Sequence, residues 1–192
     1  MDVSAVDICN IALDSLGSKP PIVSFDDSTD VARLCKRIYP VSRNKVLRAH
    51  DWNCAIARET LAPLADAPVS GYSYQYQLPI SPLCLRVLNM TNVADAEYRV
   101  EGDKLLTDEE ECSIRYIKEV TDTTAFDPDL IELIALRVAA DIAFSITQSL
   151  SIEAKSEQKY QMALYEAKGI NNTESRQPDP ETNNSWIDAG RS

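Results

Sequence analysis

The chain has 192 residues, a hydrophobic content of 44% and a formal net charge of −11. Its length fits one large domain or two small ones, and its hydrophobic fraction is sufficient for a buried core. The acidic balance argues against a protein that sequesters nucleic acid by charge attraction. The five cysteines lack paired spacing, which predicts reduced thiols in a cytosolic setting, and the N-terminus shows no signal-peptide pattern.

Two helices are predicted in the first fifty residues. Ser4 has the position of an N-cap, Asp7 completes a capping box three residues later, and Gly17 predicts the end of this helix. A second helix is predicted to begin near Thr29. Pro40 lies in its middle and lacks a backbone N–H, so we expect a kink or a break there.

The second helix carries an unusual charge balance. Between residues 30 and 50, six Lys or Arg residues occur with a single Asp. One interpretation is a solvated helix face. The other is a basic face that meets an acidic surface of a neighbouring copy, or nucleic acid. The arginines of this candidate interface are Arg33, Arg37, Arg43 and Arg48.

At Asp51 the periodicity changes from that of a helix to that of strands. Apolar residues alternate with polar or smaller ones in short runs that are separated by turn residues. About five short strands of this kind predict a small antiparallel β-sandwich or barrel. The runs lie at residues 52–56, 72–78, 83–87, 98–107 (a hairpin that turns at Gly102 and Asp103) and 114–120.

The strongest helix signal lies at Asp127–Thr147. Asp127 suits the N-cap and Pro128 the first helical position. Apolar residues surround this helix, so we expect it to be buried nearly all round. Charged residues interrupt the apolar run, which argues against a membrane span. They should lie at subunit contacts or pair within the bundle, and they are Glu132, Arg137 and Asp141.

The C-terminal part of the chain predicts a last helix and a polar tail. The helix is expected over Ile152–Lys168 and should end at Gly169. From Asn171 the sequence is too polar to bury a core. Within this tail, Trp186 and Ile187 have the character of a docking anchor.

The predicted fold is α+β: a bundle of about four helices with an inserted small antiparallel β-sandwich or barrel and an extended C-terminal tail. We divide the chain into a discontinuous helical bundle, a β-rich insertion, and a flexible tail that becomes ordered on partner binding. The corresponding residues are 1–50 with 125–170, 51–124, and 171–192.

The sequence offers little for catalysis or for binding metals and cofactors. His50 is the single histidine, no two cysteines have CxxC spacing, and no glycine-rich phosphate-binding motif occurs. The acidic run Asp108–Glu111 lacks the alternating ligands of a calcium loop and is interpreted as a solvated loop. We therefore expect no enzyme, no cofactor and no metal site.

Several short motifs follow one another along the chain: Asn10-Ile-Ala-Leu-Asp-Ser-Leu-Gly17, Ile22-Val-Ser24, Tyr39-Pro40, His50-Asp-Trp52, Tyr76-Gln-Leu-Pro79, Cys84-Leu-Arg-Val87, Val100-Glu-Gly102 and Phe126-Asp-Pro128. In this order they resemble the head-to-tail adaptor proteins of tailed bacteriophages, called tail tubular protein A in short-tailed phages. The resemblance covers about residues 5–170. It departs from the family pattern at Ile80-Ser-Pro82, where an Asp is expected before the Cys.

The resemblance implies a structural virion protein without catalytic or cofactor-binding residues. In this family the subunits form a ring, typically dodecameric, beneath the portal protein. The ring extends the channel for double-stranded DNA without sequence-specific binding and supports the tail nozzle, so it serves genome retention and ejection. It implies assembly in the host cytoplasm, a final location at the portal vertex of the virion, and no membrane partner.

Two rival functions belong to other classes. The first is a monomeric regulatory or chaperone-like binding module that uses its sheet as a peptide surface. The second is a hydrolase with a carboxylate site near Asp108–Glu111. The oligomeric state in the presence of a portal protein separates these functions from a ring subunit.

Overall fold

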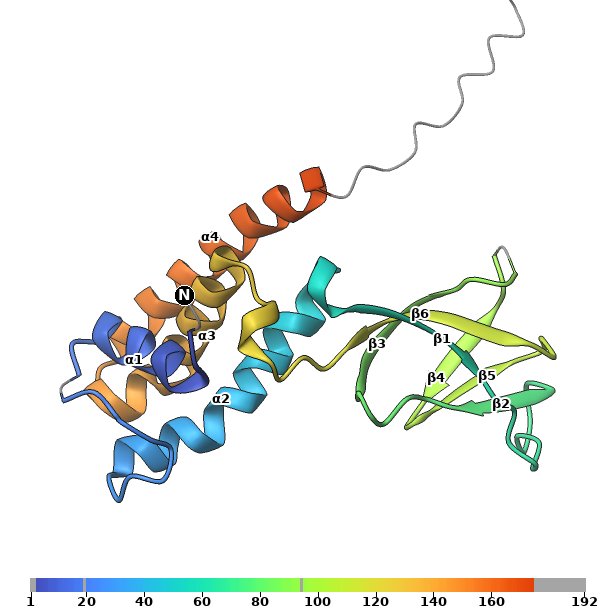
Figure 1. Cartoon of the computed structure of the whole chain (residues 1–192), viewed down its shortest axis with the longest axis horizontal. Helices are drawn as coiled ribbons and strands as arrows, with labels where there is room; N and C mark the ends of the chain where they lie inside the picture. Colours follow the sequence, from blue (N-terminus) through green and yellow to red (C-terminus); the bar gives the residue numbers. More distant parts are fainter. Residues whose placement is uncertain (1–2, 19, 94, 175–192) are drawn as a thin grey trace, which may run out of the picture.

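The computed structural model describes residues 3–18, 20–93 and 95–174 and has the predicted α+β architecture. Figure 1 shows a helical bundle beside a lobe of strands, and the strands are inserted between the second and third helices. The helices are α1 (Ala5–Ser15), α2 (Asp30–Ala49), α3 (Pro128–Thr147) and α4 (Leu150–Glu174). The strands are β1 (Ile56–Leu61), β2 (Tyr74–Gln77), β3 (Cys84–Met90), β4 (Tyr98–Glu101), β5 (Lys104–Thr107) and β6 (Cys112–Lys118).

The predicted starts of α1 and α3 are confirmed by their capping hydrogen bonds. The Ser4 hydroxyl accepts from the backbone N–H of Asp7 at 3.1 Å, and the Asp7 carboxylate accepts from the backbone N–H of Ser4 at 2.9 Å. At α3 the Asp127 carboxylate accepts from the backbone N–H of Leu130 at 2.7 Å. These side chains satisfy N–H groups that a helix leaves unpaired at its first turn.

Of the two predicted effects of Pro40, a kink or a break, the break does not occur, because α2 is one helix over Asp30–Ala49. Pro40 is exposed, whereas Tyr39 and Ser42 on either side of it are buried. Proline removes one backbone hydrogen bond and disfavours a helix interior by roughly 3 kcal/mol. The buried face that α2 presents to the bundle on both sides of Pro40 offsets this cost.

The predicted end of the last helix is also wrong. α4 continues through Gly169 to Glu174, and Gly169 is not among the residues with positive φ. A glycine marks a helix end when the backbone turns left-handed, and here Gln148 at φ 53° makes that turn between α3 and α4. Residues 171–174 of the predicted tail are therefore helical, and residues 175–192 lie outside the described part of the chain.

The β lobe is a sandwich of two three-stranded antiparallel sheets, with strand orders β1–β6–β3 and β2–β5–β4. The described part of the chain therefore contains six strands, and about five were predicted. The β4–β5 hairpin turns at Gly102 (φ 61°) and Asp103, as predicted. The side chains between the sheets, which include Tyr76, Leu105 and Ile114, are fully buried.

The first strand begins later than predicted. A short 3-10 turn, η1 (Asn53–Ala55), follows Trp52, and β1 starts at Ile56. Trp52 is 2% exposed, belongs to the core of the bundle, and donates its indole N–H to the carbonyl of Val46 at 2.8 Å. Trp52 therefore anchors the end of α2 and is not part of the first strand, although it alternates with the apolar residues that follow it.

Helix α3 is the centre of the bundle and packs against α1, α2 and α4. Leu130, Ile134 and Val138 are fully buried. Burial is less complete than predicted, because Phe144 is 44% exposed and Leu136 is half-buried. The core of the bundle also includes Ile117 of β6, so the bundle and the sandwich share packing at their junction.

Candidate functional site

Most basic side chains of α2 have acidic partners within the same chain. Lys36 Nζ lies 2.7 Å from an Asp26 carboxylate oxygen, Lys45 Nζ lies 3.2 Å from Asp141, and Arg33 pairs with Asp30. The excess of basic residues in the sequence of α2 is thus largely neutralised in space. The Arg33 and Lys36 pairs are exposed and contribute little to stability.

Arg43 is buried inside the chain and has little surface for a partner, so we remove it from the predicted interface. It is 5% exposed, and its guanidinium pairs with Glu119, which follows β6. Asn44 Nδ2 donates to the same Glu119 carboxylate at 3.0 Å. The Arg43 guanidinium also lies 5.8 Å from the centre of the Tyr39 ring. Arg43 therefore joins the bundle to the sandwich.

Two more arginines act at this junction. Arg48 donates to the backbone carbonyl of Leu85 in β3 at 2.8 Å, and Arg86 of β3 pairs with Asp51. Glu119 and Arg86 were not among the predicted site residues, because their partners are 76 and 35 positions away in the chain.

Arg37 is the predicted interface arginine that is available to a partner. It is exposed on α2, and no ion pair or hydrogen bond involves its side chain in the described part of the chain. Its exposed side chain, unpaired among the described residues, suits a contact with another molecule.

The charged residues of α3 confirm one branch of the prediction, which is pairing within the bundle. Arg137 donates to Asp141 at 2.6 Å and to Glu157 of α4 at 2.9 Å. Asp141 also accepts from the Ser42 hydroxyl of α2 at 2.6 Å. The Arg137 guanidinium lies 4.7 Å from the centre of the Tyr160 ring. This network links α2, α3 and α4.

The network also sets the charge of its members. Burial disfavours the ionised Asp141 carboxylate, but hydrogen bonds from Arg137, Ser42 and Lys45 outweigh it and hold the pKa of Asp141 below its ordinary value. Burial likewise opposes the charge of Arg137, whereas Asp141 and Glu157 raise its pKa. Both partners are therefore ionised at neutral pH.

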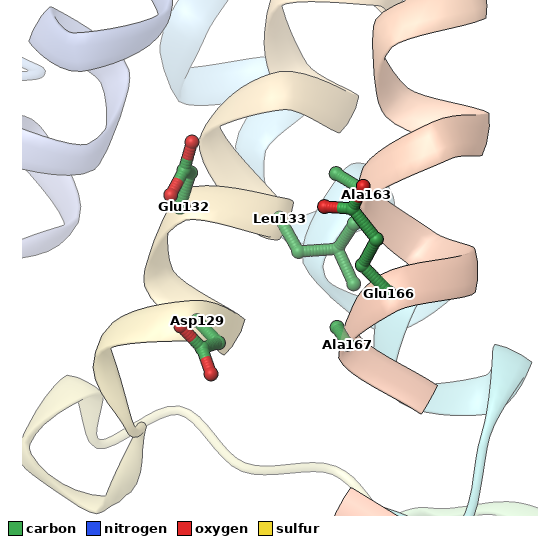
Figure 2. Close-up of a pocket in the computed structure, with 6 residues that line it drawn as sticks. All are labelled: Asp129, Glu132, Leu133, Ala163, Glu166 and Ala167. Atoms are coloured by element: carbon green, nitrogen blue, oxygen red, sulfur yellow. The ribbon is translucent and has the colours of Figure 1, made fainter. Parts of the chain in front are cut away.

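Glu132 lies apart from this network. Nine residues separate it from Asp141, and at about 100° per residue this places the two on opposite sides of α3. Figure 2 shows Glu132 with Asp129 on α3 and Glu166 on α4, around a groove of about 100 Å³. Leu133, Ala163 and Ala167 form its apolar part. Asp129 and Glu132 lie near the N-terminus of α3, where carboxylates stabilise the helix macrodipole.

The acidic run Asp108–Glu111 is a loop between β5 and β6 that is held by hydrogen bonds. The Tyr76 hydroxyl donates to the backbone carbonyls of Glu109 and Glu110 at 2.8 and 2.7 Å, and the Asp108 carboxylate accepts from the backbone N–H of Ser73 at 2.8 Å. Among the described residues, no three His, Cys, Asp or Glu side chains are grouped to hold a metal ion.

His50 packs at the end of α2. Its ring meets the Trp52 ring edge-on, with centres 4.9 Å apart. Burial lowers the pKa of His50. The negative charge of Asp51 acts to raise this pKa, and the positive charges of Lys168 and Arg86 lower it further. Lys168 of α4 therefore lies near the end of α2.

No protein-family model matches this chain, and no curated protein matches it. None of the helices in the described ranges is long and apolar enough to cross a membrane. The predicted anchor residues Trp186 and Ile187 lie outside the described residues.

Proposed function

We propose that this chain is the subunit of a head-to-tail adaptor ring of a tailed bacteriophage, a structural protein with no enzymatic activity. The ring joins the portal protein to the tail nozzle and extends the DNA channel. The observation that supports this most is the architecture. A helical bundle is interrupted between α2 and α3 by an antiparallel β-sandwich, as the resemblance from the motif order implies.

The junction between the two lobes suits a ring subunit whose lobes must hold a fixed relative position. Besides the shared core, three contacts connect the lobes: Arg43 with Glu119, Arg48 with Leu85, and Arg86 with Asp51. These contacts should keep the lobes in a fixed relative position, which a subunit needs if its portal-binding and nozzle-binding surfaces lie on different lobes. The fixed geometry also suits heterologous contacts that close a ring.

The charge of the chain suits a DNA conduit. A protein that grips DNA neutralises phosphates with unpaired Lys and Arg side chains. Here the net charge is −11, and Arg33, Lys36, Arg43 and Lys45 of α2 are paired with carboxylates of their own chain. We infer that acidic residues dominate the channel lining, so that DNA slides past it.

Co-expression with the portal protein of the same genome tests this proposal. We expect the two proteins to co-purify, and electron microscopy of the complex to show an added ring below the portal. A chain that stays monomeric and does not bind the portal contradicts the proposal and favours the monomeric binding module.

Reversing the charge of Arg37 should weaken assembly. Arg37→Glu is expected to reduce binding between subunits, or between subunit and portal, by about fivefold at low salt, since a contact at an exposed rim is worth up to about 1 kcal/mol. Arg37 is a cleaner test than Arg48, which also contacts Leu85. Lys155→Glu on the exposed face of α4 is the matched control. Native gels with purified portal measure both, and equal behaviour of the two variants removes Arg37 from the interface.

Deleting residues 175–192 should reduce portal binding and leave the fold intact. The described core residues all precede this segment, and the cut leaves α4 complete to Glu174. Circular dichroism and the melting temperature check the fold, and co-sedimentation with the portal measures binding. Undiminished binding by the shortened chain contradicts a role for the tail in portal recognition.

A further inference from the structure

A pocket lies where the end of α2 meets the sandwich, and the charged residues that line it are all positive. Its volume is about 320 Å³. Its two charged lining residues are Arg48 and Arg86, although acidic residues outnumber basic ones in the chain by 30 to 19. The other lining residues are Leu78, Cys84, Leu85, Val87, Val100 and Gly102.

The two arginines retain hydrogen-bonding capacity after their contacts at the junction. Arg48 donates one hydrogen bond to the Leu85 carbonyl, and Arg86 donates through Nη2 to Asp51. A guanidinium has five N–H donors, and its geometry matches a carboxylate. The Nε of Arg86 is buried and has no partner in the described part of the chain. The junction therefore holds both arginines in place, and each guanidinium makes one of its possible hydrogen bonds there.

The pocket combines these donors with exposed apolar surface. Val100, which lines the pocket, is 44% exposed. Leu83, which precedes the lining residue Cys84 in the sequence, is 40% exposed. A ligand that fits both features has an apolar or aromatic side chain next to a carboxylate. A peptide segment of this composition buries the apolar part and pairs the carboxylate.

The chain itself contains such a segment outside the described residues. Trp186, Ile187 and Asp188 follow one another in an otherwise polar stretch. Trp186 is one of two tryptophans, and the other, Trp52, is buried in the bundle. Trp186 and Ile187 match the apolar surface of the pocket, and Asp188 matches its two arginines.

The end of α4 brings this segment within reach of the pocket. Ala167 of α4 and Trp52 belong to the same buried core, and Lys168 acts on His50, which lies two residues after Arg48. Trp186 follows Glu174 by twelve residues, which span up to roughly 40 Å when extended, more than the roughly 30 Å diameter of a small domain. Tethering gives an effective concentration of about 1 mM, so even a weak contact is populated.

We propose that residues 186–188 dock into the Arg48–Arg86 pocket of their own chain before assembly. Trp186 and Ile187 lie against Val87 and Val100, and the Asp188 carboxylate accepts hydrogen bonds from the two arginines. On the proposed function, the portal then competes with this pocket for the segment. The docking itself is a property of the free chain and does not depend on that function.

Hydrogen–deuterium exchange of the full-length free chain tests the docking. Amides of residues 184–190 should exchange about tenfold more slowly than in an unstructured peptide, independent of protein concentration. Val100→Glu, which adds a carboxylate to the lining of the pocket, and Asp188→Lys should each abolish this protection. Their combination should restore part of it. Val69→Glu, at a fully exposed position outside this pocket, is the control and should leave the protection unchanged.

Three results would each overturn the proposal, and the first two concern the exchange itself. One is unprotected exchange of residues 184–190 in the wild-type chain, and the other is protection that survives Val100→Glu. Protection that grows with protein concentration would also overturn it, because the segment would then occupy a second copy. Because no portal is present in this measurement, its failure leaves the ring proposal standing, and failure of portal binding leaves the docking standing.

Discussion

Replacing Arg43 with methionine is expected to lower the free energy of unfolding by about 3 kcal/mol. Methionine keeps most of the length of the side chain but removes the charge that pairs with Glu119. The Arg43 side chain is 6% exposed and that of Glu119 26%, so the remaining carboxylate is left partly buried with Asn44 as a weaker donor. Urea unfolding followed by circular dichroism measures the loss.

The exposed pair on the same helix supplies the control for Arg43. Arg33 pairs with Asp30 in the same chemical manner, but the side chains are 61% and 96% exposed. Arg33→Met should therefore cost less than about 1 kcal/mol. Equal losses for the two variants would show that the buried pair adds nothing beyond ordinary surface electrostatics.

The Arg43 variant also tests how the two lobes depend on each other. Arg43 comes from the bundle, whereas Glu119 follows the last strand of the sandwich. If this pair couples the lobes, its removal should broaden the unfolding transition or divide it into two. A ring subunit with weakened coupling should then bind the portal less tightly even though both lobes remain folded.

The elements that were predicted correctly depend on short-range chemistry. The N-caps Ser4 and Asp127 act on backbone groups within three residues, and the turn at Gly102 and Asp103 connects two adjacent strands. The apolar surface of α3 predicted a central helix because it needs cover on several sides. Such features can be recognised from a window of a few residues.

The elements that were missed depend on contacts between distant residues. Arg43 and Glu119 are 76 positions apart, so the sequence showed a basic helix but not the carboxylates that neutralise it. Pro40 was predicted to kink or break its helix and Gly169 to end one, because the helix propensity of both residue types is unfavourable. Packing of the surrounding helix overrides that preference in α2, and Gly169 lies within α4.

The candidate interface shows the same division. Its charged residues were chosen by charge in the sequence, and the structure separates them into three groups. Arg33, Arg43, Arg137 and Asp141 pair inside the chain, Arg48 belongs to the junction, and Arg37 and Glu132 are exposed. Charge alone could not distinguish these roles, because pairing depends on which helices pack together.

The network at Asp141 should make the bundle sensitive to acid. The folded pKa of Asp141 lies below its ordinary value of 3.8, so the ionised carboxylate stabilises the folded chain above about pH 4. This contribution is lost as the pH falls through the folded pKa. At pH 7, Asp141→Asn should lower the free energy of unfolding by about 2 kcal/mol, because Arg137 loses its charged partner at 2.6 Å.

The pH dependence identifies the cause of that loss. The difference between wild type and Asp141→Asn should shrink as the pH falls below about 4, since the wild-type carboxylate then becomes protonated as well. Asp26→Asn is the control, because the pKa of Asp26 is also lowered by its partner Lys36, but both side chains are exposed. Raising the salt concentration should screen the effect of Asp26 and leave most of the effect of Asp141, whose side chain is 15% exposed. A stability difference at Asp141 that is independent of pH would indicate altered packing and exclude the ion pair as its source.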